Sequence, residues 1–262
     1  MSNSYWSLLV LASAVLLCSC RTVPISSRRQ LLLSSDAEEQ ELGATAYSEY
    51  KKEYPVSKNR VYVEALDRVG LAIQKVAEKD DYKWEFTVLE SEIANAFCLP
   101  GGKVAVYSAI YQFIDNDAEL ATVVSHEIAH ALARHGGERM SWATMQQLGS
   151  LGLRNAGAGA VAEAVYGYGT QLGVMLPFSR KHENEADSIG LILMAKAGYH
   201  PAAAVSFWKK FGGDRNPSLI EQWTSTHPGG SERVTKLNEL QAEALAAYNQ
   251  APVKYGLGQK IK

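Results

Sequence analysis

The sequence predicts an α+β fold that is mainly helical, with a small sheet beside a central helix. Through most of the chain, apolar residues recur at three- and four-residue steps, which is the period of an amphipathic helix. The period changes to two only near residues 82–107, where aromatic and β-branched residues are frequent. Of the 262 residues, 47% are hydrophobic, which is enough for one large domain or two small ones with a core.

The charge of the chain is close to balanced. There are 26 basic and 28 acidic residues, giving a net charge of −2. Such a chain has no overall field to hold a polyanion, so no nucleic acid partner is expected. Binding must therefore depend on a local site.

The first residues have the pattern of an export signal. The apolar stretch Leu8–Leu17 is too short to span a bilayer and suits the core of a signal peptide. Cys20 follows Leu17-Cys18-Ser19, which resembles the bacterial lipobox, where the Cys becomes the acylated first residue. An ordinary signal peptide is the alternative, since no Lys or Arg precedes the apolar stretch. We predict a lipoprotein signal peptide at 1–19 and lipidation of Cys20.

The residues after Cys20 are predicted to be a tether. They are polar and show no clear period, as expected of a segment that lifts a domain off a lipid surface. Arg21 after Cys20 resembles the sorting pattern for the outer membrane of a diderm bacterium. Cys98 is then the one Cys of the folded part, so no disulfide is expected within the domain. The predicted parts are a signal peptide, a tether, one domain and a C-terminal tail: 1–19, 20–35, 36–250 and 251–262.

Two helices are expected before the sheet. Asp36–Tyr54 has acidic residues in its first turn and basic residues in its last, as the helix dipole favours, and Pro55 ends it. Residues 59–78 repeat apolar residues with helical spacing.

The sheet is expected from three extended runs. Tyr82–Glu90 has the two-residue period of a strand. Ala94–Leu99 and Lys103–Tyr107 flank the turn Pro100-Gly101-Gly102, so they are expected to form a hairpin.

Helices are expected in most of the remaining chain. One should begin after the cap candidates 115–117, run over Ala118–His135 and end at Gly136-Gly137. The stretch Leu148–Phe178 is rich in Gly and Ala; we favour packed helices or a mobile flap over a membrane hairpin, because its apolar runs are shorter than about twenty residues. The later helices are predicted at Lys181–Lys196, from Pro201 and from Pro228.

Two histidines of the central helix predict a metal site. His126 and His130 are four residues apart, so they project from one face of a helix. In the pattern His-Glu-x-x-His, zinc binds the two imidazoles and the carboxylate, here Glu127, meets the bound water. The flanking residues are apolar, so these groups would be costly to bury without a metal between them. His135 lies about 140° further round the helix and is expected to interact with the helix dipole.

The third ligand is expected from a second helix. Glu183 and Asp187 are four residues apart and share a face, whereas Glu185 points away from it and is expected to be solvated. Glu183 could complete a His-His-Glu site for one Zn²⁺. Asp187 could accept the second N–H of a ligand histidine and fix its tautomer. The alternative is an ordinary charged helix N-terminus.

Four motifs occur in a characteristic order: His126-Glu127-x-x-His130 preceded by Asn95–Tyr107, then Ser179–Asp187, then Ser225–Arg233. Together they resemble the HtpX and CAAX-prenyl-endopeptidase family of zinc metallopeptidases. The likeness covers Ala37–Leu240 and is nearest to a small periplasmic lipoprotein branch without transmembrane helices. It implies a zincin-like metallopeptidase domain in which Glu183 is the third zinc ligand. Asp187 is then the acid that hydrogen-bonds a ligand histidine without binding the metal.

The resemblance bears on three further residues. Family members commonly have Ala at the position of Cys98, which we interpret as a core residue because no His base accompanies it. In relatives, the His that corresponds to His227 lies near the metal, and in some it is proposed to occupy a zinc position until substrate displaces it; a capping role is the alternative. Arg233 could support the substrate carbonyl or pair with an acidic residue.

The predicted function is that of a zinc-dependent endopeptidase that cleaves unfolded or misassembled cell-envelope proteins by metal-activated water. It is expected to be periplasmic and lipid-anchored. The substrate backbone is expected to pair with an exposed strand edge, although an internal strand is possible. One alternative is a zinc-bound chaperone or assembly factor whose site His227 closes, and another is a zinc esterase. The residues of the expected edge are Val104, Ala105, Val106 and Tyr107.

Overall fold

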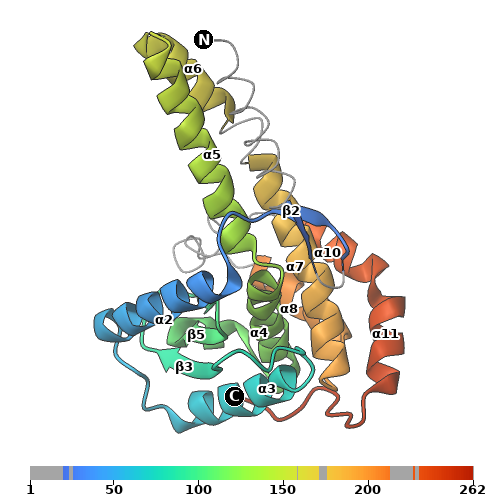
Figure 1. Ribbon diagram of the computed structural model, residues 1–262. Helices are drawn as coiled ribbons and strands as arrows, with labels where there is room; N and C mark the ends of the chain where they lie inside the picture. The colour runs from blue at the N-terminus through green and yellow to red at the C-terminus, as the bar shows by residue number, and fades with distance from the viewer. Residues whose placement is uncertain are drawn as a thin grey trace.

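The fold is arranged around helix α4 (Asp117–Leu132), every residue of which is buried. In this computed structural model, the described residues are 20–23, 26–157, 159–170, 176–212, 227 and 230–261. The Asn116 side chain caps α4 by accepting a hydrogen bond from the Glu119 backbone N–H. A small sheet lies to one side of α4 and the other helices of the core surround it (Figure 1). The mainly helical α+β prediction is confirmed.

The sheet has three strands, β3 (Glu85–Leu89), β4 (Ala96–Leu99) and β5 (Lys103–Tyr107), in the order β3-β5-β4. Strand β5 pairs in parallel with β3 and antiparallel with β4. The prediction that Val104, Ala105, Val106 and Tyr107 form an exposed edge is therefore wrong. Strand β4, the hairpin partner, pairs with one edge of β5, and β3 pairs with the other edge. Among the described strands, none pairs with the outer edge of β4.

Two helices precede the sheet in the chain, α2 (Asp36–Glu53) and α3 (Arg60–Gln74). Ser35 forms a capping box with Glu38 at the start of α2. Asn59 caps α3 by accepting from two backbone N–H groups. A 3-10 helix, η1 (Ser108–Phe113), leads from the sheet towards α4.

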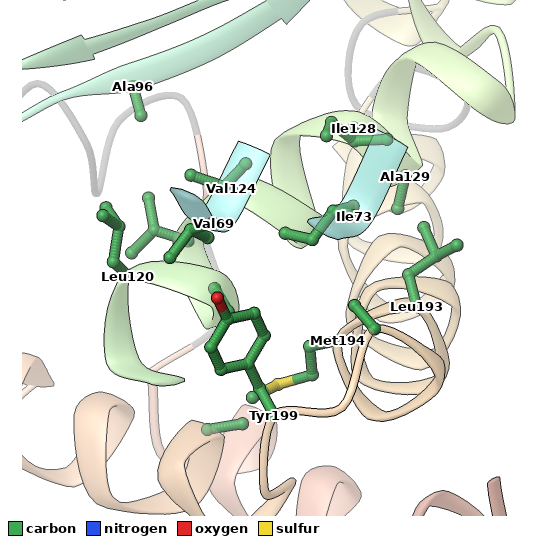
Figure 2. Close-up of a cluster of buried hydrophobic side chains, with 14 of the residues drawn as sticks. Val69, Ile73, Ala96, Leu120, Val124, Ile128, Ala129, Leu193, Met194 and Tyr199 are labelled. Carbon is green, nitrogen blue, oxygen red and sulfur yellow. The ribbon is translucent and has the colours of Figure 1, made fainter. Parts of the chain in front are cut away.

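The core lies where α3, α4 and α7 (Leu176–Lys196) meet. Figure 2 shows apolar side chains from all three helices in one cluster. Burial of each such side chain is worth about 1.5–3 kcal/mol relative to exposure, so this cluster fixes how α7 lies against α4. Two labelled members from each helix are Val69 and Ile73 of α3, Val124 and Ile128 of α4, and Leu193 and Met194 of α7.

The central helix ends earlier than predicted. After Leu132 the chain turns at Arg134, which has a left-handed backbone (φ 54°), and a new helix α5 (His135–Asn155) begins. Arg134 is held there by two hydrogen bonds to Glu39 of α2. Gly137 lies inside α5. The position requires glycine because a Cβ there would collide with the Glu39 carboxylate. Of the two glycines predicted to end the helix, Gly137 thus permits close packing instead.

Helices α5 and α6 (Ala160–Thr170) form a hairpin that projects from the rest of the molecule (Figure 1). Arg154 of α5 pairs with Glu163 of α6 across the hairpin. The described part of the Gly/Ala-rich segment therefore consists of packed helices. Within the described residues, no helix has the length and apolar character needed to cross a membrane.

The C-terminal half adds α8 (Ala202–Gly212), α10 (Gly230–Glu239) and α11 (Gln241–Gln250). Helix α7 begins five residues before the predicted Lys181, and the long helix expected from Pro228 is divided at Leu240. The C-terminal residues also pack on the domain. Ile261 is buried and its N–H donates to Asp115 O, just before α4.

The predicted tether is not an irregular linker. It contains an antiparallel hairpin of β1 (Cys20–Thr22) and β2 (Arg29–Leu31), and Val23 and Leu32 are buried. Residues 20–35 thus pack on the domain through apolar side chains. The predicted signal peptide, residues 1–19, lies outside the described residues.

Gly190 sets the spacing of α4 and α7, which predicts a specific effect of substitution. A Cβ at Gly190 would lie 3.0 Å from the backbone N and Cα of His126. Gly190→Ala should therefore push the helices apart and lower the free energy of unfolding by about 1–3 kcal/mol. Gly136→Ala is the matched control, since no atom lies within 4 Å of its added methyl group. Urea denaturation measures both; equal stability of the two variants would contradict this packing.

Candidate metal centre

Four side chains from separate parts of the chain converge beside α4. His126 and His130 come from one face of α4, Glu183 comes from α7, and His227 lies between helices α8 and α10. Their ligand atoms all lie within 4.8 Å of one another. The two predicted histidines and the predicted glutamate are thus brought together, and His227 joins them.

The geometry of the cluster is that of chelating groups around a common point. His126 Nε2 and His130 Nε2 are 3.2 Å apart, and each lies 3.3 Å from an oxygen of Glu183. Glu183 and both histidines are buried. Neutral imidazole nitrogens and a carboxylate are the donor set that zinc takes in three-ligand sites, so the residues fit that metal.

Glu127 lies beside the cluster as the sequence pattern requires. It is buried, and its Oε1 has no hydrogen-bond partner among the described residues. His227 Nε2 lies 3.6 Å from that oxygen. A buried carboxylate oxygen without a partner is costly. A polar group held within the cluster would satisfy it.

Asp187 and Arg233 fix the orientation of the cluster. Asp187 Oδ1 lies 3.0 Å from His126 Nδ1, which is the contact expected of an acid behind a ligand histidine. Arg233, only 3% exposed, donates to Asp187 Oδ2 at 2.6 Å and to Glu183 Oε2 at 2.9 Å. Its guanidinium also lies 3.9 Å above the Trp208 ring. Of the two roles considered for Arg233, the geometry shows the pairing with acidic side chains.

His227 has a metal-proximal position. Its Nδ1 is 3.0 Å from Glu183 Oε2 and 3.3 Å from His126 Nε2. The opposite nitrogen faces Glu127. A histidine at this place occupies space that a bound ligand or substrate would need.

The protonation of the two glutamates differs because their surroundings differ. Burial would raise the pKa of Glu183, but hydrogen bonds from His126, His130 and His227 outweigh it and hold that pKa well below its usual range. Burial raises the pKa of Glu127, against the opposing effect of the nearby His227. Glu183 is therefore a carboxylate suited to hold a cation, and Glu127 is a stronger base than an exposed glutamate.

The histidines also differ. Burial lowers the pKa of His130 well below its usual value, which keeps it neutral. Burial and Arg233 would lower the pKa of His126, but its contacts with Asp187 and Glu183 raise it to about 9. A cation in the cluster would have to displace that proton from His126.

Two residues of this region were not expected to contribute. His135 Nδ1 lies 2.8 Å from His130 Nδ1, and His135 Nε2 lies 2.9 Å from Glu185 Oε2. The prediction of a solvated Glu185 is wrong, since it is 8% exposed. The azimuth of His135 cannot be counted along α4, because Arg134 breaks the helix. No local signal could reveal the burial of Glu185, because Arg28, 157 residues away, covers it.

Buried His and Glu ligands within a mainly helical α+β domain define a zincin-like metal centre. Residues 63–241 match the family described as Peptidase family M48, and the chain belongs to that family. The resemblance drawn from the four motifs is thus confirmed at this level, while the narrower lipoprotein branch stays a prediction.

Named relatives come from mitochondria and bacteria. The chain is 34% identical over 231 residues to Mitochondrial metalloendopeptidase OMA1 of Schizosaccharomyces pombe, covering 85% of this chain and 66% of the relative. It is 38% identical to that of Arabidopsis thaliana, over 64% of this chain and 34% of the relative. Beta-barrel assembly-enhancing protease of Escherichia coli K12 is 28% identical to the chain, over 67% of this chain and 38% of the relative. The chain thus spans less than two thirds of the length of each.

Cys98 provides a test of which groups belong to the centre. It is buried in β4, and burial raises the pKa of its thiol. Cys98→Ala should therefore keep full metal binding, with a loss of roughly 1 kcal/mol in stability from the small cavity. His130→Ala should lose bound metal. Metal content by mass spectrometry of the purified variants measures both, and metal loss in Cys98→Ala would show that a ligand has been missed.

Proposed function

We propose that this chain is a zinc-dependent endopeptidase that binds one Zn²⁺ through His126, His130 and Glu183. The observation that carries the proposal is the buried carboxylate oxygen of Glu127 beside those three ligands, which has no hydrogen-bond partner in the described part of the chain. A structural metal site would leave no reason for such a base. The family assignment and the printed names of the relatives support the same activity.

The chain's residues divide the chemistry between them. When bound, zinc would lower the pKa of a water molecule towards about 7 and polarise the substrate carbonyl. Glu127 accepts the proton of the attacking water and then donates it to the nitrogen of the leaving amine. Asp187 holds His126 through Nδ1 so that Nε2 faces the centre. Arg233 holds Glu183 and Asp187 in register.

The substrate is proposed to lie along β4 rather than β5. Strand β4 packs against α4. Glu127 of α4 contributes to the raised pKa of the Cys98 thiol in this strand. Its outer edge has no strand partner among the described residues, so an extended peptide could pair with it. Such pairing recognises backbone more than side chains, which favours unfolded polypeptide as substrate.

The cellular setting is also a proposal. The lipobox-like sequence supports lipidation of Cys20, a membrane anchor and a periplasmic location on the outer membrane. The name of the Escherichia coli relative refers to β-barrel assembly, which agrees with misassembled envelope proteins as substrates. The OMA1 relatives are named as mitochondrial, so they do not support this location.

His227 favours one alternative function. Its contacts with Glu183, His126 and Glu127 could close the site in a zinc-bound chaperone or assembly factor. In that case turnover would be absent, and the base at position 127 would have no role.

Two substitutions distinguish these functions. Glu127→Gln should retain about one zinc per chain and lower hydrolysis of unfolded casein by about 10²–10⁴-fold, because the proton acceptor is lost. Glu183→Ala should lose both zinc and hydrolysis. Zinc content and casein cleavage are measured on both variants beside the wild type. Wild-type protein that binds zinc but leaves casein intact would favour the chaperone.

The proposed peptide groove predicts a dependence on substrate length. Peptides that extend further on both sides of the cleaved bond should show a higher kcat/KM, because each added residue can pair with β4. Quenched fluorescent peptides of increasing length measure this. A rate independent of length, together with cleavage of small esters, would favour the esterase.

A further inference from the structure

A buried chain of side chains connects the N-terminal hairpin to the metal centre. Arg28, which precedes β2, donates from Nε to Glu185 Oε2 at 2.9 Å. The same carboxylate oxygen lies 2.9 Å from His135 Nε2, and His135 Nδ1 lies 2.8 Å from His130 Nδ1. His130 Nε2 faces the cluster. All four side chains are at least mostly shielded from solvent.

Metal binding through His130 Nε2 determines the direction of each hydrogen bond in this series of side chains. A histidine that binds a metal through Nε2 carries its proton on Nδ1, so His130 Nδ1–H donates to His135 Nδ1. His135 must then carry its proton on Nε2, which donates to Glu185. Arg28 has only donors, and Glu185 as a carboxylate only accepts. Each contact therefore fits one arrangement, which orients the His130 ring for binding.

The hairpin is fixed in place by the same arginine. Arg28 Nη1 and Nη2 donate to the two oxygens of Glu138 at 2.9 and 2.6 Å, and Glu138 Oε2 contacts His182 Nε2 at 3.0 Å. Ser26 adds a hydrogen bond to Glu185. The guanidinium thus joins α5 and α7, the two helices that carry His135 and Glu185. A bidentate Arg–carboxylate pair has the geometric precision that such a role needs.

We propose that Arg28 is a positioning residue for the metal centre, acting through Glu185 and His135 on His130. The segment that follows the predicted lipid anchor is then part of the metal site, and its docking sets the affinity for zinc. The inference rests on the proposed function only in taking zinc as the metal that His130 binds.

The test measures zinc affinity by competition with a chromophoric chelator, at fixed pH, on the full chain. Arg28→Met and His135→Phe should each weaken zinc binding about 10-fold or more, the usual effect of losing an outer contact to a ligand histidine. Phe can keep the stacking of His135 on His182, whose rings are 4.0 Å apart. Arg28→Lys, which keeps the charge but not the fork, should lie between wild type and Arg28→Met.

Arg68→Met is the matched control. Arg68 also pairs with a buried carboxylate through two nitrogens, Asp117 at the start of α4, but it makes no contact with this chain of residues. The Arg68→Met variant should bind zinc with wild-type affinity. The melting temperature of each zinc-free variant separates a loss of stability from a loss of affinity. If Arg28→Met unfolds, His135→Phe and Arg28→Lys still provide the test.

The double variant Arg28→Met/His135→Phe makes the test specific. The effects of substitutions at residues that act through the same series of hydrogen bonds are not additive. Adding Arg28→Met to His135→Phe should therefore weaken zinc binding by less than a further 3-fold. Wild-type zinc affinity in folded Arg28→Met, or fully additive losses in the double variant, would overturn the proposal. A wild type that binds no zinc would instead contradict the proposed function.

Discussion

The close approach of α7 to α4 is the constraint on which the metal centre depends. Gly190 lets the two helices pack with backbone against backbone at His126, and Ala186 is buried in the same contact. At that distance Glu183 reaches the two imidazoles, and Asp187 reaches the far nitrogen of His126. A wider separation would leave the same residues on the same helix faces without a common centre. The apolar core that α4 and α7 share with α3 holds this spacing (Figure 2).

The polar groups at this interface are too many to be explained by stability. Four acidic side chains, Glu127, Glu183, Glu185 and Asp187, are buried there with Arg233, and the side chain of Arg28, which pairs with Glu185, is 12% exposed. Well-packed apolar residues would often stabilise such an interface as well or better. Arg233 instead fixes the direction of Glu183 and Asp187, and Arg28 fixes that of Glu185. Their arrangement is that of a centre in which ligand geometry must be exact to fractions of an ångström.

Local geometry explains which parts of the site could be predicted from the sequence. His126 and His130 share one helix face whatever the rest of the chain does, and the same holds for Glu183 and Asp187. The sequence alone predicts an edge at 104–107, because the parallel pairing of β5 with β3, which is not its hairpin neighbour, leaves no local pattern. The predicted direction of His135 is wrong because it requires α4 to continue through Arg134, whose left-handed backbone ends the helix. The contact of Arg28 with Glu185 joins residues too far apart for any spacing argument.

X-ray absorption at the zinc edge tests the central claim most directly, because it reports the atoms around the metal without depending on turnover. For purified protein loaded with one equivalent of zinc, a nitrogen and oxygen shell is predicted at about 2.0–2.1 Å, with an imidazole signature from two or three histidines. The same shell should be lost or rearranged in Glu183→Ala. A sulfur atom at about 2.3 Å, or a shell that Glu183→Ala leaves unchanged, would contradict a centre built from His126, His130 and Glu183.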